Sequence, residues 1–233
     1  MEINIACLYP DVLNMYGDKG NIITLKYRLE KRGINAKVKE YFANDSIDFE
    51  NTDIIYIGGG SDKCYENIYS YLLPQKQQFA SYIENGGCVL AVCTGYQLLG
   101  TECEFEDKTL PGLGILDIST KKAKKLIGDI VMECPLTQSK ITGFINKNHK
   151  ISGGNYDKLG TAVYPESFDE GTVYKNVIAT YVYGPLLPKN PKLADMILKN
   201  AVTKKYGDDV ILEKLNDDLE QKASEYIINK YSK

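Results

Sequence analysis

The sequence predicts an α/β protein with a single doubly wound, mostly parallel sheet and helices on both of its faces. Two observations predict it. Short apolar runs alternate with amphipathic segments through the first hundred residues, in the order strand, helix, strand, helix, strand. Two of these runs, 53–57 and 88–92, are apolar at almost every position, which is typical of parallel strands that are covered on both faces.

The first half of the chain divides into clear elements. The expected strands are 3–8, 36–41, 53–57 and 88–92, and the expected helices are 21–32 and 75–85. Ile22, Leu25 and Leu29 recur at spacings of three and four, which places them on one face of the first helix. Gly33 follows directly and is expected to end that helix.

The second half is richer in strand signals. We expect strands at 113–118, 127–132, 141–145 and 177–183, a helix that begins near Pro191, and a charged amphipathic helix at the end of the chain. No repeat or long linker divides the sequence. We therefore predict one domain over 1–202, with 203–233 as a helical extension of the same domain.

Composition excludes several classes of function. The 233 residues are 43% hydrophobic and 25% charged, with a net charge of -3, so a nucleic-acid partner is not expected. The short basic cluster Lys121, Lys122, Lys124 and Lys125 is typical of a solvated loop or strand edge. No run of about 18 apolar residues occurs, so we expect no membrane insertion.

Cysteine usage indicates a reducing compartment. None of the six cysteines has C-x-x-C spacing, so neither a zinc site nor any other metal site is expected. The chain begins with an apolar run that is typical of a strand and not of a secretory leader. We therefore predict a cytoplasmic protein with free thiols.

Cys93 stands where a buried strand turns into a helix. Such a turn exposes the sulfur, and the unpaired N–H groups of the helix start favour the thiolate, so the pKa is expected to move from about 8.5 toward neutrality. Gly95 would let the helix approach the sheet closely, as in the nucleophile turn of α/β-hydrolases. The alternative is a buried core cysteine, which is our interpretation of Cys88, inside the same strand.

A second glycine turn, 58–60, ends the neighbouring strand. Acyl chemistry needs N–H donors for an oxyanion, and the backbone of Thr94 could supply one while this loop supplies the other. The alternative is a phosphate-binding loop. The chain has no G-x-x-x-x-G-K-[ST] pattern, which argues against ATP binding of that type.

These turns, with four further segments, carry a family resemblance. The segments are 57–62, 92–100, 13–22, 112–117, 128–131 and 184–190. Together they resemble the class I glutamine amidotransferases, whose glutaminase domain has a flavodoxin-like architecture. Within these, the chain is most similar to the GatD family of glutaminase subunits of lipid II isoglutaminyl synthase; it has less of the pattern of the cobyric acid synthases.

The resemblance implies a reaction and a partner. Glutamine would be hydrolysed through a thioester on Cys93, with Gln97, Gly59, Gly60 and the Thr94 backbone around the substrate. Ammonia would pass, within a heterodimer, to a Mur-ligase-like subunit of the MurT type. That partner would use ATP and magnesium to amidate D-glutamate in lipid II, in peptidoglycan biosynthesis for the cell wall and cell shape. No cofactor is implied in this chain.

Three positions depart from the family pattern. The catalytic histidine of the family corresponds to Tyr183, and a phenol with a pKa near 10 is a poor general base at neutral pH. The one histidine of the chain, His149, lies in a segment predicted to be a loop and is a possible substitute base. Lys125 corresponds to an arginine that binds the substrate in the family. Lysine keeps the positive charge but lacks the planar guanidinium group that binds a carboxylate through two parallel hydrogen bonds.

Three hypotheses remain open from the sequence. The chain is a working glutaminase subunit, a catalytically impaired glutaminase-like subunit that docks on or regulates a synthetase, or a thiol hydrolase for another amide on the same fold. Family position favours the first two; Tyr183 adds weight to the second, and the working glutaminase remains the leading hypothesis.

Overall fold

The structure is a computed structural model that describes residues 1–231. Its strands are β1 (Glu2–Leu8), β2 (Asn35–Tyr41), β3 (Ile54–Ile57), β4 (Cys88–Val92), β5 (Glu102–Glu104), β6 (Thr109–Pro111), β7 (Ser119–Cys134), β8 (Ser139–Ser152), β9 (Gly160–Tyr164), β10 (Phe168–Glu170), β11 (Thr172–Tyr174), β12 (Val177–Thr180) and β13 (Val182–Tyr183). Its α-helices are α1 (Lys19–Glu30), α2 (Tyr65–Leu72), α3 (Lys76–Glu84), α4 (Thr94–Leu99), α5 (Pro191–Tyr206) and α6 (Asp218–Tyr231).

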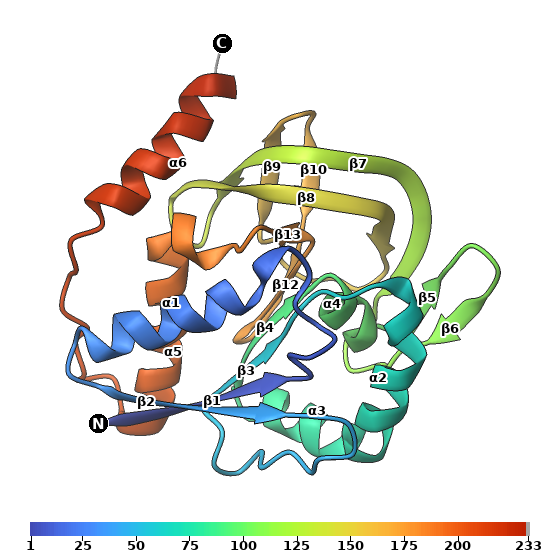
Figure 1. Cartoon of the computed structure of the whole chain (residues 1–233), viewed down its shortest axis with the longest axis horizontal. Helices are drawn as coiled ribbons and strands as arrows, with labels where there is room; N and C mark the ends of the chain where they lie inside the picture. The colour runs from blue at the N-terminus through green and yellow to red at the C-terminus, as the bar shows by residue number, and fades with distance from the viewer. Residues whose placement is uncertain (232–233) are drawn as a thin grey trace.

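The main sheet has the strand order β11-β12-β4-β3-β1-β2, and every neighbouring pair is parallel except β11 with β12. Helices α1 and α5 lie on one side of it, and α2, α3 and α4 lie on the other (Figure 1). β3 and β4 are buried along their whole length, as their apolar sequences predicted. The prediction of an α/β fold with a mostly parallel sheet between helices is confirmed.

A second sheet joins the single sheet that the sequence predicted. Its centre is the long antiparallel pair β7 and β8, which arches over the carboxyl ends of the main strands (Figure 1). β13 pairs with β8 and therefore connects this sheet to the end of β12. A β-bulge interrupts the pairing between Lys122 and Leu126, and bulges of this kind bend a strand and redirect its side chains.

The strand predicted at 113–118 is wrong. This segment is a loop whose backbone bonds to the end of α4, from Leu113 N to Leu98 O at 2.8 Å and from Ile115 N to Leu99 O at 3.0 Å. Leu113 and Leu116 are fully buried. The apolar residues that suggested a strand are therefore buried by packing on a helix end.

The extension predicted at 203–233 is only partly helical. α5 continues to Tyr206, residues 207–217 are irregular, and α6 follows; residues 232–233 lie outside the described part. The buried guanidinium of Arg28 bonds to Asp195 at 2.7 Å and to Asp217 at 2.6 Å, which fixes the irregular segment to α1 and α5. Within residues 1–231, no helix combines the length and the apolar character that a membrane crossing needs.

Candidate active site

Cys93 has the backbone conformation of a sharp turn. Its φ is +49° and its ψ is -103°, a region that side chains other than glycine adopt at a cost of about 1–3 kcal/mol. The turn is held by bonds from Cys93 N to Thr180 O and from Gln97 N to Cys93 O, both 2.9 Å. A Cβ on Gly95 would lie 2.5 Å from the carbonyl oxygen of Ile57, so glycine is what lets α4 sit against β3.

A cavity opens in front of this turn. Cys93 is partly exposed and lines a cavity of about 270 Å³. The cavity walls come from the glycine loop after β3, from α4, β7 and β8, and from the segment that leads from β12 through β13, and include Gly60, Gln97, Lys125, His149, Tyr181 and Tyr183. Six of the residues predicted to form the site therefore share one cavity wall: Gly60, Cys93, Gln97, Lys125, His149 and Tyr183.

Tyr183 lies next to Cys93 around Gly59 and is 1% exposed. Desolvation raises the pKa of Cys93 to about 12, although the neighbouring hydroxyl of Tyr183 favours the thiolate. Burial, together with Cys93, also raises the pKa of Tyr183 far above its usual range. Both groups are thus neutral at pH 7, as a thiol and a phenol.

The expected fall in the pKa of Cys93 is therefore wrong. The helix that follows it has only six residues, and its first turn is packed against the sheet. A helix N-terminus changes such a pKa by at most about one unit, whereas burial changes it by several. Cys88, interpreted from the sequence as a core residue, is fully buried inside β4, and its pKa is also raised to about 12 by burial.

Two of the candidate oxyanion donors are engaged inside the protein. The N–H of Gly59 donates to Oδ2 of Asp18 at 2.8 Å, and the N–H of Gly60 donates to the hydroxyl of Thr94 at 3.0 Å. The backbone of Thr94, next to the Cys93 sulfur in the chain, favours the thiolate. A substrate oxygen would have to displace one of the two internal acceptors to receive a second donor.

Asp18 is the site residue that sequence reasoning missed. It is fully buried, and within residues 1–231 its Oδ1 has no hydrogen-bond partner. Burial raises its pKa to about 7. A Cβ placed on Gly59 would touch Tyr183, Cys93 and Asp18 together, so these side chains meet around one glycine. The sequence feature that indicates Asp18 is its position in the loop after β1, at the carboxyl edge of the parallel sheet, where ligand sites of such folds lie.

His149 lies on β8 and is 3% exposed, so the expectation of a loop position is wrong. Its Nε2 donates to the carbonyl of Glu104 at 2.8 Å, and its Nδ1 faces the amide of Gln97 at 3.5 Å. In the described part of the chain, no hydrogen bond joins His149 to Cys93. The imidazole therefore orients Gln97, while Tyr183 is the side chain next to the sulfur.

Lys125 is the cationic group that reaches the Cys93 cavity from β7. It is exposed, lies at the β-bulge, and has no ion pair within residues 1–231. A free ammonium at a cavity mouth can bind a carboxylate as a point charge. In the same described range, no group of three or more His, Cys, Asp or Glu side chains is arranged to hold a metal ion.

Comparisons of the sequence and the structure with known proteins identify relatives of this chain. Residues 4–191 match the family model described as the CobB/CobQ-like glutamine amidotransferase domain. The chain is 37% identical to "Lipid II isoglutaminyl synthase (glutamine-hydrolyzing) subunit GatD" of Streptococcus pneumoniae, over 96% of this chain and 90% of that protein. The subunit of the same name from Staphylococcus aureus is also 37% identical, over 98% of this chain and 96% of that protein.

The fold comparison agrees with the sequence comparisons. A crystal structure of a glutamine amidotransferase matches with a TM-score of 0.58 and 17% identity, over 84% of this chain and 98% of that chain. At this level of identity the match concerns the fold alone.

Proposed function

Because the chain belongs to the CobB/CobQ-like glutamine amidotransferase family, we propose that it is the glutaminase subunit of a lipid II isoglutaminyl synthase. The observation that carries the proposal is Cys93, held in a strained turn with an open cavity before its sulfur. The near full-length similarity to two GatD subunits supports the choice of acceptor. A cytoplasmic location and a role in peptidoglycan synthesis belong to the same proposal.

The cavity suggests how glutamine would react. Its α-carboxylate would pair with Lys125, and its δ-carbonyl carbon would lie against the Cys93 sulfur. The sulfur forms a bond to that carbon, the C–N bond breaks, and the thiol proton leaves with the nitrogen as ammonia. Water then cleaves the thioester, which releases glutamate and restores the thiol.

Proton transfer is the demanding part of this scheme. Tyr183 would contact the sulfur, but its raised pKa keeps it a neutral phenol at pH 7, which is not a base for the thiol proton. Asp18, with a pKa of about 7, is the group beside the pair that can change its charge near neutrality. Loss of its charge would also loosen its hold on the Gly59 N–H, which the oxyanion needs.

Ammonia would be used by a second subunit. We propose a heterodimer with a Mur-ligase-like subunit of the MurT type, which binds ATP and magnesium and activates the D-glutamate carboxylate. This chain itself would need no cofactor.

The Cys93–Tyr183 pair favours a second candidate function. A neutral thiol and a neutral phenol, both with raised pKa values, supply neither a thiolate nor a base at pH 7. General acid–base catalysis typically contributes about 10²–10⁴-fold to a rate, so its loss would leave little activity. In this alternative, the chain is a catalytically impaired glutaminase-like subunit that docks on the synthetase or regulates it.

Glutamate release separates the two candidates. The chain is incubated with glutamine, with and without a Mur-ligase-like subunit, and glutamate is measured enzymatically. Release that depends on Cys93, lost in Cys93→Ala and kept in Cys88→Ala, supports the glutaminase. No release above background with the partner present rejects it and leaves the docking subunit. Equal losses in both variants would show that the nucleophile is misassigned.

A further inference from the structure

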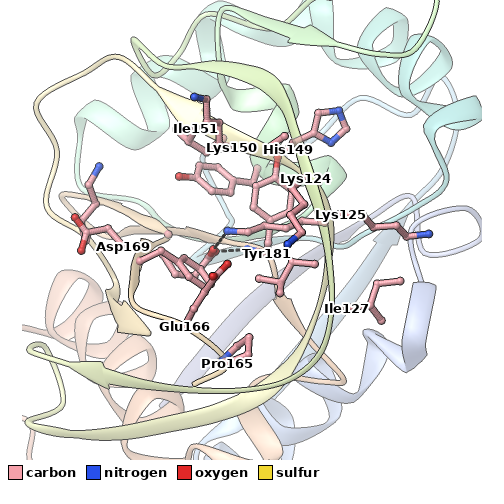
Figure 2. A pocket seen from close by; sticks show the side chains of 18 residues that line it. Lys124, Lys125, Ile127, His149, Lys150, Ile151, Pro165, Glu166, Asp169 and Tyr181 are labelled. Carbon is pink, nitrogen blue, oxygen red and sulfur yellow. Dashed lines mark hydrogen bonds and ion pairs between the residues drawn. The ribbon is translucent and has the colours of Figure 1, made fainter. Parts of the chain in front are cut away.

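A second and larger cavity adjoins the Cys93 cavity along β7 and β8, and the two share part of their lining. Its volume is about 750 Å³, within the range of small-molecule sites. Lys150 lies across it from Pro165 and Glu166, and Lys124 and Lys125 lie across it from Asp169 (Figure 2). The walls come from β7, β8 and the segment that includes β10, so residues distant in sequence converge on one space.

The lining of this cavity is positively charged although the chain is acidic overall. Five lysines and three acidic residues line it, on a protein whose net charge is -3. Lys147 and Glu170 form an ion pair at 2.6 Å, and Glu170 is further held by Tyr181 N at 2.8 Å. The four other lysines have no ion pair within residues 1–231: Lys124, Lys125, Lys150 and Lys158.

The position of these lysines contrasts with that of their neighbours. Lys121 and Lys122, on the same strand, pair with Glu102 and Glu106 and do not line the cavity. The β-bulge begins just after them and brings Lys124 and Lys125 to the cavity. The unpaired charge is therefore concentrated at the cavity, whereas the charge beside it is neutralised.

Aromatic rings form part of the same wall. Tyr96, Phe168 and Tyr181 line the cavity, and the ammonium of Lys147 lies 4.4 Å from the centre of the Phe168 ring. Lysines bind phosphate groups as point charges, and aromatic walls favour a ligand with a flat apolar part. We propose that this cavity binds a small phosphorylated anion with at least two negative charges, either a diphosphate group or a nucleoside diphosphate.

Such a ligand would act close to the Cys93 cavity. Lys125, Lys147, His149 and Tyr181 line both cavities, so the anion and a glutamine carboxylate would compete for Lys125. Binding at this site does not depend on glutaminase activity, so an absence of binding would leave the proposed function unaffected.

Isothermal titration calorimetry of the full chain tests the proposal. Inorganic pyrophosphate and ADP are titrated at low salt, into the wild type, into Lys124→Ala/Lys150→Ala, and into the matched control Lys121→Ala/Lys122→Ala. Both double variants remove two positive charges from the same strand pair, so the control corrects for the overall charge. Thermal melting checks that both fold.

We expect a wild-type Kd below about 1 mM that weakens with salt. The cavity variant should lose at least tenfold in affinity, and the control should change by less than about twofold. Tighter binding of ADP than of pyrophosphate would identify a nucleotide, and equal binding would identify the diphosphate alone. Absence of binding of either probe, or equal losses in the two variants, would overturn the proposal.

Discussion

Tyr183→His tests the account of the Cys93–Tyr183 pair. Tyr183 is the side chain next to Cys93, so an imidazole there would occupy the position of a base. With a pKa of about 12, only about 3 in 10⁵ Cys93 side chains are thiolate at pH 7.5, whereas a thiol of pKa about 8.5 would be about one tenth ionised. We therefore expect the rate of glutamate release to rise by about 10²–10⁴-fold, the usual contribution of general acid–base catalysis.

The assay measures glutamate release with and without the partner subunit, and the rate of Cys93 alkylation by iodoacetamide against pH. The midpoint of the alkylation profile should fall in Tyr183→His. Tyr183→Phe is the matched control, because it removes the hydroxyl without adding a base, and its rate should not rise. The double variant with Cys93→Ala should be inactive. A Tyr183→His rate within twofold of the wild type would refute the assignment of Tyr183 to the base position.

Three further predictions concern stability. The pKa of Asp18 is raised in the folded state from about 4 to about 7, so its protonated form stabilises the fold below pH 4 and this contribution is lost as the pH rises to 7. The free energy of unfolding of the wild type, relative to Asp18→Asn, should fall by about 2–4 kcal/mol over this window, and parallel urea-unfolding curves would contradict this. Gly95→Ala should destabilise by about 1–3 kcal/mol because its Cβ meets Ile57 O; an unchanged melting temperature would mean that α4 can shift freely. Arg28→Ala should cost about 3–5 kcal/mol because Asp217 and Asp195 lose their common partner, and a loss under 1 kcal/mol in chemical unfolding would refute a structural role for this ion pair.

The parallel half of the fold could be predicted because its signals are local. Strands β3 and β4 are short apolar runs, each followed by a turn that contains glycine, and they pair with each other. The second sheet could not be predicted as a sheet, because a strand pattern in the sequence does not indicate which other strand it pairs with. β5, for example, pairs in parallel with the start of β7 and antiparallel with β6.

The site was predictable in position and less so in chemistry. The turn at Cys93 and the glycine loop follow from sequence, because strand ends and glycines are visible there. The raised pKa of Cys93 and the role of Asp18 depend on burial by residues from distant segments, which no local pattern records. His149 was expected in a loop because its segment is polar, and the pairing of β8 with β7 is what makes it a strand.

Labelling with a chloromethyl ketone analogue of glutamine, followed by peptide mass spectrometry, tests whether Cys93 is the nucleophile of a glutamine site. We predict a single adduct, on Cys93, that forms faster in Tyr183→His than in the wild type and is prevented by excess glutamine. An adduct on another cysteine, or no glutamine-protected adduct in either protein, would contradict it.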